Sequence, residues 1–203
     1  MTLLSQEEVL IEKMLKFYSN PSCLSIFIGI VEQRTVISLR LLDWFSTNYS
    51  KFNRIYIDKI DIHSDYKNKL DGYKKKCFDP FCRKQRIFVY AKDTKCIRKN
   101  LPENLNLSYK YIENYEEYLS DPSGIVTTVG QLNFFMWCME RNILDYIIKN
   151  FKIIEQSMSD TYKLKTLSKK NEKLKNPLEK IPIDRKKYSS VAHKTFMKFT
   201  ISF

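Results

Sequence analysis

The chain has 203 residues, of which 43% are hydrophobic and 14% aromatic, and its formal net charge is +12. This apolar content suffices for a packed core, which argues against a disordered chain, and the presence of only 4 glycines argues against glycine-rich phosphate loops. The excess of lysine and arginine favours anionic partners, and nucleic acid is the usual one.

The first fifty residues are predicted to form two helices with an apolar segment between them. A capping box of Ser5 and Glu8 begins the first helix, and residues 20–22 (NPS) end it. Residues 23–33 (CLSIFIGIVEQ) fit a buried strand or a short buried helix, and their β-branched content favours the strand. Residues 37–51 (ISLRLLDWFSTNYSK) carry an apolar face at helical spacing and are predicted to form the second helix.

The middle of the chain is predicted to contain two strands and a polar helix. Residues 54–60 (RIYIDKI) are expected to form a strand, and residues 63–76 (HSDYKNKLDGYKKK) a helix with few core positions. Pro80 after Asp79 forces a turn or an extended joint, because the residue before a proline avoids the helical region. Residues 86–92 (RIFVYAK) are the best strand candidate in the chain.

The next segment is predicted to be a strand and then mostly helix. Residues 107–119 (LSYKYIENYEEYL) fit a strand that leads into a short acidic helix, and residues 121–124 (DPSG) form a turn. Residues 127–142 then begin a helix with a Thr-x-x-Gln capping box. Residues 143–154 either continue that helix or begin a new one after Asn142.

These elements predict a single α+β domain in which a small mixed sheet is covered by the helices at residues 37–51 and 128–156. We expect a core domain at residues 1–156, followed by a basic linker or arm at 157–190 that orders only on a partner. Residues 191–203 end in an alternating pattern, TFMKFTISF, and are predicted to return to the sheet as a strand.

The positive charge is concentrated in two blocks. Residues 67–99 hold 12 cations and 3 anions, and residues 163–188 hold 10 cations and 3 anions, whereas residues 100–162 are net acidic. In the first block the cations flank the proline turn, which can converge them on one spot, and arginine supplies a two-pronged fork for phosphate. The residues predicted to contact phosphate are Lys74, Lys75, Lys76, Arg83, Lys84, Arg86, Lys169, Lys170, Arg185, Lys186 and Lys187.

The aromatic side chains near these cations have two interpretations. Tyr73, Phe78 and Phe81 stand among the lysines and arginines, an arrangement that suits stacking on unpaired bases. The interpretation that we favour is that Phe78 and Phe81 point into the core and anchor the turn. In the same way, residues 133–139 (NFFMWCM) fit a central core helix better than a surface that faces a partner.

The cysteines give a weak metal signal. Cys77 and Cys82 are separated by four residues, with Cys96 and His63 as further candidates. A structural zinc site usually has two closely spaced ligand pairs, and a second pair is missing here. We therefore interpret the cysteines as free thiols, which behave as small hydrophobic side chains, and expect no metal or other cofactor.

Catalytic patterns are also weak. Asp58, Asp61 and Asp65 are closely spaced, but a strand would place the first two on opposite faces, so solvated surface charge explains them better than a magnesium site does. The sequence contains no phosphate-binding loop, no dinucleotide fingerprint and no nucleophile elbow. We therefore expect a protein that is not an enzyme.

The sequence favours an intracellular protein that does not enter membranes. Five cysteines in irregular spacing, together with a start that lacks a basic segment and an apolar core, fit a reducing compartment. The most apolar run near the N-terminus is shorter than the roughly 18 residues that a membrane span needs.

Three segments together resemble a family of small proteins of nucleocytoplasmic large DNA viruses, the giant viruses. They are ISLRLLDWFSTNYSK (37–51), SDYKNKLDGYKKKCFDPFCRKQRI (64–87) and TTVGQLNFFMWCMERNILDYI (127–147). The end of the chain, RKKYSSVAHKTFMKFTISF (185–203), is similar to that family more loosely. The resemblance implies a viral origin and a location in the host cytoplasm, at the viral factory, or in the virion. It transfers no catalytic residue.

We therefore predict a viral nucleic-acid-binding accessory protein, acting in transcription, replication or genome packaging through its two basic blocks. The alternative is a virion structural or assembly protein that uses the basic arm and the apolar helix to contact other viral proteins, including a second copy of itself.

Overall fold

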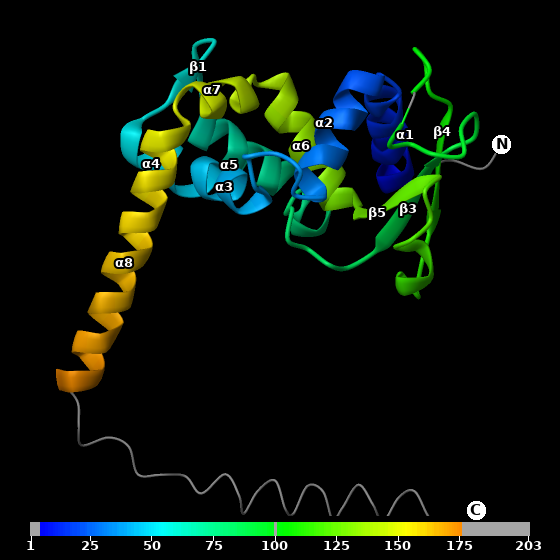
Figure 1. Ribbon diagram of the computed structural model, residues 1–203. Helices are drawn as coiled ribbons and strands as arrows, with labels where there is room; N and C mark the ends of the chain where they lie inside the picture. The colour runs from blue at the N-terminus through cyan, green and yellow to red at the C-terminus, as the bar shows by residue number, and fades with distance from the viewer. Residues whose placement is uncertain (1–4, 100, 176–203) are drawn as a thin grey trace, which may run out of the picture. The chain divides into compact units, whose positions relative to one another are not determined.

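The computed structural model describes residues 5–99 and 101–175. Figure 1 shows the order of the elements, whose bounds are α1 (Gln6–Tyr18), α2 (Pro21–Val31), α3 (Leu39–Trp44), the π-helical segment η1 (Phe45–Tyr49), α4 (Ser50–Asn53), β1 (Tyr56–Ile57), β2 (Ile60–Asp61), α5 (Ile62–Tyr73), the 3-10 turn η2 (Lys75–Cys77), β3 (Arg86–Ala91), β4 (Leu107–Tyr111), the 3-10 turn η3 (Glu116–Tyr118), β5 (Gly124–Thr128), α6 (Val129–Glu140), α7 (Ile143–Lys149) and α8 (Phe151–Lys175).

The chain divides into two compact units, Met1–Met158 and Ser159–Phe203, and the architecture below is that of the first unit. Helix α8 extends to Lys175, although its composition predicts a linker or arm that orders only on a partner. Lysine, leucine and glutamate are good helix formers, which explains a helix in a segment with little apolar surface. The predicted strand at residues 191–203 lies outside the described residues.

A three-stranded antiparallel sheet, in the order β4-β3-β5, forms one side of the core. The α+β class is confirmed, but the described strand pairs are all antiparallel, where we expected a mixed sheet. Strand β5 was not predicted, because its five residues (GIVTT) show no clear alternation. Along β3, Ile87, Val89 and Ala91 belong to the core, whereas Phe88 and Tyr90 stack on each other on the opposite face.

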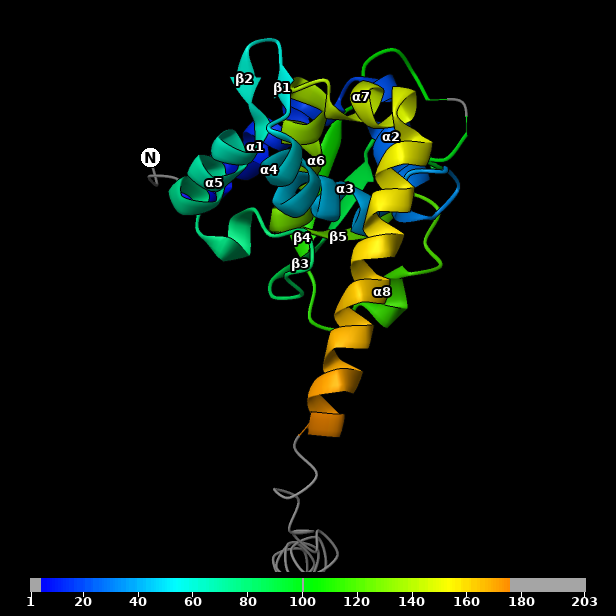
Figure 2. The same cartoon turned by 90° about the vertical axis from the view of Figure 1, so that its left-hand side faces the viewer.

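Helix α6 is the innermost element of this unit. Its residues Leu132 to Cys138 are all buried, so the interpretation of NFFMWCM as a core helix is confirmed and the one in which it faces a partner is wrong. In Figures 1 and 2, α6 lies at the centre, among α1, α2, α3 and α5. The Tyr18 hydroxyl of α1 donates a buried hydrogen bond of 2.9 Å to the Leu132 carbonyl.

The sheet is covered mainly by α1 and α6. Helix α1 contacts β4, and α6 contacts β5 directly after the chain leaves the sheet. We expected the helix at residues 37–51 to share this role, but it forms α3, η1 and the start of α4, and η1 packs against α5. The predicted strand at residues 54–60 forms a small hairpin of β1 and β2, because Asp58 and Lys59 both take positive φ angles and turn the chain.

Residues 23–31 lie in α2 (Pro21–Val31), so the favoured strand is wrong and the alternative, a short buried helix, is confirmed. Asn20 caps this helix by accepting a hydrogen bond of 2.9 Å from the Ser22 amide, and Pro21 occupies the first turn, where its missing N–H costs nothing. Leu24, Phe27 and Ile28 are buried at helical spacing. The cap and the proline therefore outweigh the β-branched content of the segment.

The capping box predicted for α1 is complete, whereas the one predicted for α6 is present only in part. Ser5 and Glu8 form a complete capping box, with the Glu8 side chain accepting from the Ser5 amide at 2.8 Å. Thr128 caps α6 by accepting from the Gln131 amide at 3.1 Å. The Gln131 side chain does not complete that box, because its Oε1 accepts from the Thr127 hydroxyl at 2.9 Å.

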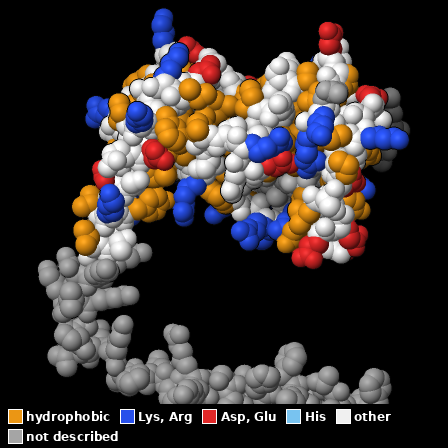
Figure 3. Space-filling view, in the orientation of Figure 1, with side chains coloured by type: hydrophobic (Ala, Val, Ile, Leu, Met, Phe, Trp, Pro, Cys, Tyr) orange, Lys and Arg blue, Asp and Glu red, His pale blue; other side chains and the backbone are white. Residues whose placement is uncertain are grey.

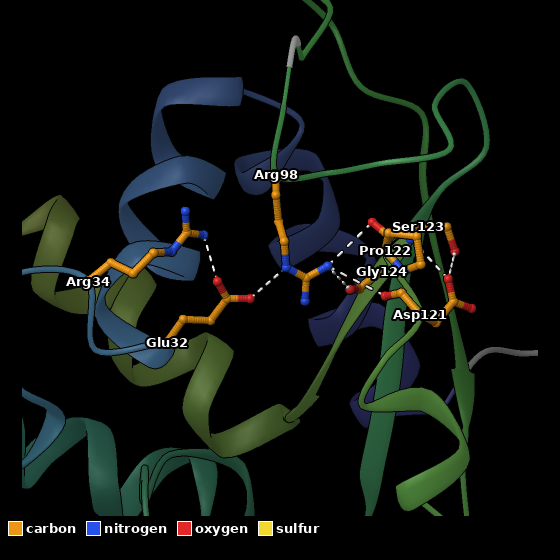
Figure 4. Close-up of polar contacts among 7 residues, drawn as sticks. All are labelled: Glu32, Arg34, Arg98, Asp121, Pro122, Ser123 and Gly124. Atoms are coloured by element: carbon orange, nitrogen blue, oxygen red, sulfur yellow. Dashed lines mark hydrogen bonds and ion pairs between the residues drawn. The ribbon is translucent and has the colours of Figure 1, made fainter.

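Arg98 joins the end of α2 to the turn that precedes β5 (Figure 4). Its Nε donates to Glu32 Oε1 at 2.7 Å, and its Nη1 lies 3.2 Å from the carbonyl oxygen of Gly124. The same Nη1 also lies within 3.5 Å of the carbonyl oxygens of Asp121 and Pro122. One guanidinium thus donates to several backbone carbonyls of this turn, of which that of Pro122 also accepts from the Ile97 amide at 3.0 Å.

Within the described residues, no single helix has the length and hydropathy of a membrane span. Taken as a pair, α1 and α2 reach both, with a bend of 103° between the two helices.

Candidate nucleic-acid interface

The segment from Lys74 to Arg86, here called the basic turn, is fixed to α6. Phe78 is fully buried and its ring contacts those of Phe134 and Trp137. The Asn133 side chain donates a buried hydrogen bond of 2.9 Å to the Cys77 carbonyl. Gly130 allows the closest approach, because a Cβ at this position would lie 2.6 Å from the Asp79 carbonyl oxygen.

The bend itself is made by Asp79 and Pro80. The Asp79 carboxylate accepts a hydrogen bond of 2.8 Å from the Phe81 amide, and its carbonyl accepts one of 3.1 Å from the Cys82 amide. Lys74 and Gln85, near the two ends of the turn, both take positive φ angles. The predicted turn is therefore present, and its outer residues are held out from the core.

The two phenylalanines of the FDPF sequence have opposite environments. Phe78 is buried, as we expected, but Phe81 is 50% exposed, so the expectation that both rings point into the core is wrong for Phe81. Phe78 lies where the turn packs on Phe134 and Trp137 of α6, and Phe81 follows the bend at Asp79 and Pro80.

The cations of the basic turn differ in how strongly the protein itself engages them. Lys76 donates to Glu7 at 2.6 Å and to Gln85 at 3.2 Å, and the hydrogen bond to Glu7 raises the pKa of Lys76. Lys75 lies 3.7 Å from the Asp79 carboxylate but is mostly exposed. Lys74, Arg83 and Lys84 are exposed, and the described residues offer them no hydrogen bond or ion pair.

Arg86 is engaged in a different way, by an aromatic ring. Its guanidinium lies 3.5 Å from the centre of the Tyr115 ring. A cation–π contact of this kind orients the guanidinium but leaves its charge and the N–H groups at its edge available. Lys and Arg side chains gather at the lower edge of the face shown in Figure 3, at the level of the loop that leads into β3.

A groove of about 450 Å³, here called the arginine groove, lies on one side of the basic turn. Its lining contains two arginines and no carboxylate. The residues that line it are Leu39, Pro80, Phe81, Cys82, Arg83, Arg86, Tyr115, Leu119, Val126, Thr127, Thr128 and Gln131. The two arginines attract anions, although Tyr115 and Leu119 belong to the acidic segment ENYEEYL, whose glutamates are exposed beside the groove.

A second groove, of about 680 Å³, lies on the other side of the basic turn and has a mixed charge. Lys74 and Lys76 line it together with Glu7 and Glu8 from the first turn of α1. The Tyr111 hydroxyl also donates to Glu7, at 3.1 Å. The structure therefore places Lys74 and Lys76 at one groove and Arg83 and Arg86 at the other, whereas Lys75 and Lys84 line neither. Of these two grooves, only the arginine groove has no carboxylate in its lining.

The family described as "Family of unknown function (DUF7197)" matches this chain over residues 2–114 and 105–190. An uncharacterized protein of Acanthamoeba polyphaga mimivirus is 32% identical over 175 residues, which cover 82% of this chain and 59% of that protein. No solved structure matches the chain.

The chain belongs to DUF7197.

The resemblance to a giant-virus family is thereby confirmed at the level of the family. This DUF7197 chain spans 59% of the length of its mimivirus relative.

The cysteines of this DUF7197 chain are separate thiols in the structure. Cys77 is buried, and burial raises the pKa of its thiol. Cys82 and Cys96 are half-buried, and His63 Nδ1 lies 3.3 Å from the Ser46 carbonyl oxygen. Among the residues that the structure describes, no group of three or more His, Cys, Asp or Glu side chains could hold a metal ion.

The three closely spaced aspartates each contact a protein group. Asp58 accepts from the Asn142 side chain at 3.0 Å, and Asp61 caps α5 by accepting from the Ser64 amide at 2.9 Å. Asp65 accepts from Trp137 Nε1 at 2.8 Å and from Arg141 Nε at 2.6 Å, which tethers α5 to α6.

The second basic block is described only in part. Lys169 and Lys170 lie in α8, where the structure describes the backbone but not their side chains. Arg185, Lys186 and Lys187 lie outside the described residues. These five residues stay predictions.

Sequence reasoning missed the far wall of the arginine groove. Tyr115 and Leu119 come from the acidic segment ENYEEYL, which we read only as a short helix. The two tyrosines of that segment, three residues apart, could have indicated cation–π contacts. The Tyr115 ring contacts Arg86, and the centre of the Tyr118 ring lies 4.3 Å from the Lys110 ammonium. Nothing in the sequence, however, indicates which cations these rings would meet.

Proposed function

We propose that this DUF7197 chain is a viral nucleic-acid-binding accessory protein that holds the phosphate backbone with Arg83, Lys84 and Arg86. The observation that carries the proposal is the arginine groove, whose lining contains two arginines and no carboxylate. Lys84, next to Arg83 in the chain, is exposed. The protein acts by binding rather than by catalysis, in the host cytoplasm, at the viral factory, or in the virion. Its process is transcription, replication or genome packaging.

The chemistry of the groove suits phosphate. A guanidinium presents N–H donors in a planar fork that matches two oxygens of a phosphate, as it also matches those of a carboxylate, and Tyr115 holds the Arg86 fork in one orientation. The side chains of Arg83 and Lys84 are exposed and unpaired within the described residues, so binding a phosphate would break no hydrogen bond or ion pair described for them. Contacts of this kind bind phosphate irrespective of base sequence.

The second basic block would supply further phosphate contacts. Residues 163–188 carry 10 cations and 3 anions, and Lys163 and Lys165 are exposed on α8. If this segment follows a phosphate backbone, each neutralised phosphate releases counterions and steepens the salt dependence of binding. Lys169, Lys170, Arg185, Lys186 and Lys187 are the proposed contacts there.

Binding of a labelled oligonucleotide at several salt concentrations tests the proposal. We expect the logarithm of the affinity to fall linearly with the logarithm of salt concentration. The double variant Arg83→Glu, Lys84→Glu should bind more weakly and with a shallower salt slope. A matched control, Lys13→Glu with Lys51→Glu, changes the charge equally at exposed lysines of α1 and α4 and should lose much less affinity. Equal losses in the two double variants would refute the arginine groove as the site.

The alternative, a virion or assembly protein, loses one of its two supports, because the NFFMWCM helix is buried. Its remaining basis is the basic arm. Solution mass and competition by an acidic peptide separate it from nucleic-acid binding: a stable homo-oligomer whose basic segment prefers the peptide would favour assembly.

A further inference from the structure

Phe81 is an aromatic ring that the fold does not need for its core. It is 50% exposed, while Phe78, three residues earlier, fills the core contacts of the turn. Leu119 in the same groove is 59% exposed. Two large apolar side chains held in the open beside two arginines are a combination typical of a binding surface rather than of a solvated turn.

The arginine groove has room for one small planar group. Its space of about 450 Å³ lies within the roughly 300–1,000 Å³ of small-molecule sites. Phe81 and Arg83 line it from the basic turn, Tyr115 and Leu119 from the segment around η3, and further lining residues come from the end of β5 and the start of α6.

The groove also contains a hydrogen-bond donor that the fold leaves unused. Gln131 Oε1 accepts from the Thr127 hydroxyl, whereas the side-chain nitrogen of Gln131, Nε2, has no partner among the described residues. That nitrogen is a donor that suits a carbonyl oxygen on the edge of a base.

We propose that the arginine groove binds one unpaired nucleotide, so that the protein selects single-stranded over duplex nucleic acid. The base lies against Phe81 with Leu119 at its border, and Arg83 and Arg86 hold the adjoining phosphates. This inference rests on the proposed function, since it names the form of nucleic acid that the same site takes.

The physical reason for the selection is access to the face of the base. In a duplex each base is already stacked and paired, and extracting one costs a few kcal/mol. In a single strand the face of the base is free, and stacking on an aromatic side chain is tolerant of sequence because every base has such a face. Cations alone would instead hold both forms by their phosphates.

Fluorescence anisotropy with the full chain tests the inference. The probes are an oligothymidylate of about 12 nucleotides, in the range of single-strand site sizes, and a duplex of the same length. The wild type should bind the single strand more tightly, and Phe81→Ala should weaken that binding by roughly 5- to 100-fold, the range for loss of one stacked base. Duplex binding should change little, and Phe81→Trp should restore single-strand binding.

Two controls complete the test. Phe52→Ala removes an equally apolar side chain that is 69% exposed on α4, and it should leave both affinities unchanged. Thermal unfolding of Phe81→Ala should match the wild type, because half of that ring is already in water.

The outcomes separate this inference from the proposed function. If the single strand and the duplex bind equally and Phe81→Ala changes neither, the inference is overturned while phosphate binding by Arg83 and Lys84 stands. If neither nucleic acid binds, or if a polyglutamate peptide displaces both at equal charge concentration, both proposals fail and an acidic protein partner takes their place.

Discussion

Substitution of Gly130 by alanine tests whether the basic turn is held directly against α6. The added Cβ would lie 2.6 Å from the Asp79 carbonyl oxygen and 3.0 Å from the Lys76 carbonyl oxygen. Both obstacles are backbone atoms, and α6 cannot retreat because Leu132 to Cys138 are buried around it. The turn must therefore move away from the helix.

The expected loss follows from what that movement breaks. Overpacking in a filled site costs about 1–3 kcal/mol, and the hydrogen bond from Asn133 to the Cys77 carbonyl contributes about 1 kcal/mol more. Replacement of a helical glycine by alanine returns up to about 1 kcal/mol. We expect Gly130→Ala to lower the free energy of unfolding by about 2–3 kcal/mol.

Urea unfolding followed by circular dichroism measures this loss as a shift of the midpoint to lower urea with an unchanged slope. The matched control is Gly72→Ala near the end of α5, where an added Cβ meets no atom within 4 Å and should raise stability by up to about 1 kcal/mol. If Gly130→Ala were as stable as Gly72→Ala, the close approach of the turn to α6 would be wrong.

Three further substitutions test a partly buried carboxyl group, the tether between α5 and α6, and the backbone conformation of Lys74. Burial raises the pKa of Asp43 to about 6, and the nearby Asp79 carboxylate adds to the effect. The folded protein therefore favours the neutral form of Asp43. The resulting contribution to stability is complete below the pKa of the unfolded chain, about 3.8, and is lost as the pH rises through 6. Asp43→Asn should therefore raise the melting temperature more at neutral pH than near pH 4, and an equal gain at both would contradict this. Asp65→Ala removes the carboxylate that accepts hydrogen bonds from Trp137 and Arg141. It should lower the free energy of unfolding, measured by chemical denaturation, by about 2–4 kcal/mol. A loss below about 0.5 kcal/mol would show that this tether contributes little to stability. Lys74→Gly relieves a strained backbone with φ 63° and ψ 152° and should raise the free energy of unfolding by about 1 kcal/mol, measured as a higher denaturation midpoint. A lower midpoint would refute backbone strain at this position.

The sequence predicts the elements whose signals are local. The capping box at Ser5, the turn at Pro80 and the strand at residues 86–92 all depend on neighbours within a few residues, and all are present. Residues 23–31 fit a strand or a short buried helix by apolar content alone, and the cap at Asn20 with Pro21, which is also a local signal, decides for the helix.

The candidate site was only partly predictable, because its properties depend on distant residues. Lys74 and Lys76 look equivalent in the sequence, yet Lys76 is paired with Glu7, 69 residues away. Phe78 and Phe81 also look equivalent, and only the packing of the turn on α6 separates them. Arg86 and Tyr115 meet because the strands of the sheet bring their segments together.

Attachment of the basic turn to α6 has a kinetic consequence for any ligand. A recognition element anchored to the innermost helix is already rigid before the encounter, so docking there carries little ordering entropy. Association should then be fast, steered by long-range attraction and free of a slow conformational phase, so that differences in affinity between ligands arise mainly from their rates of departure.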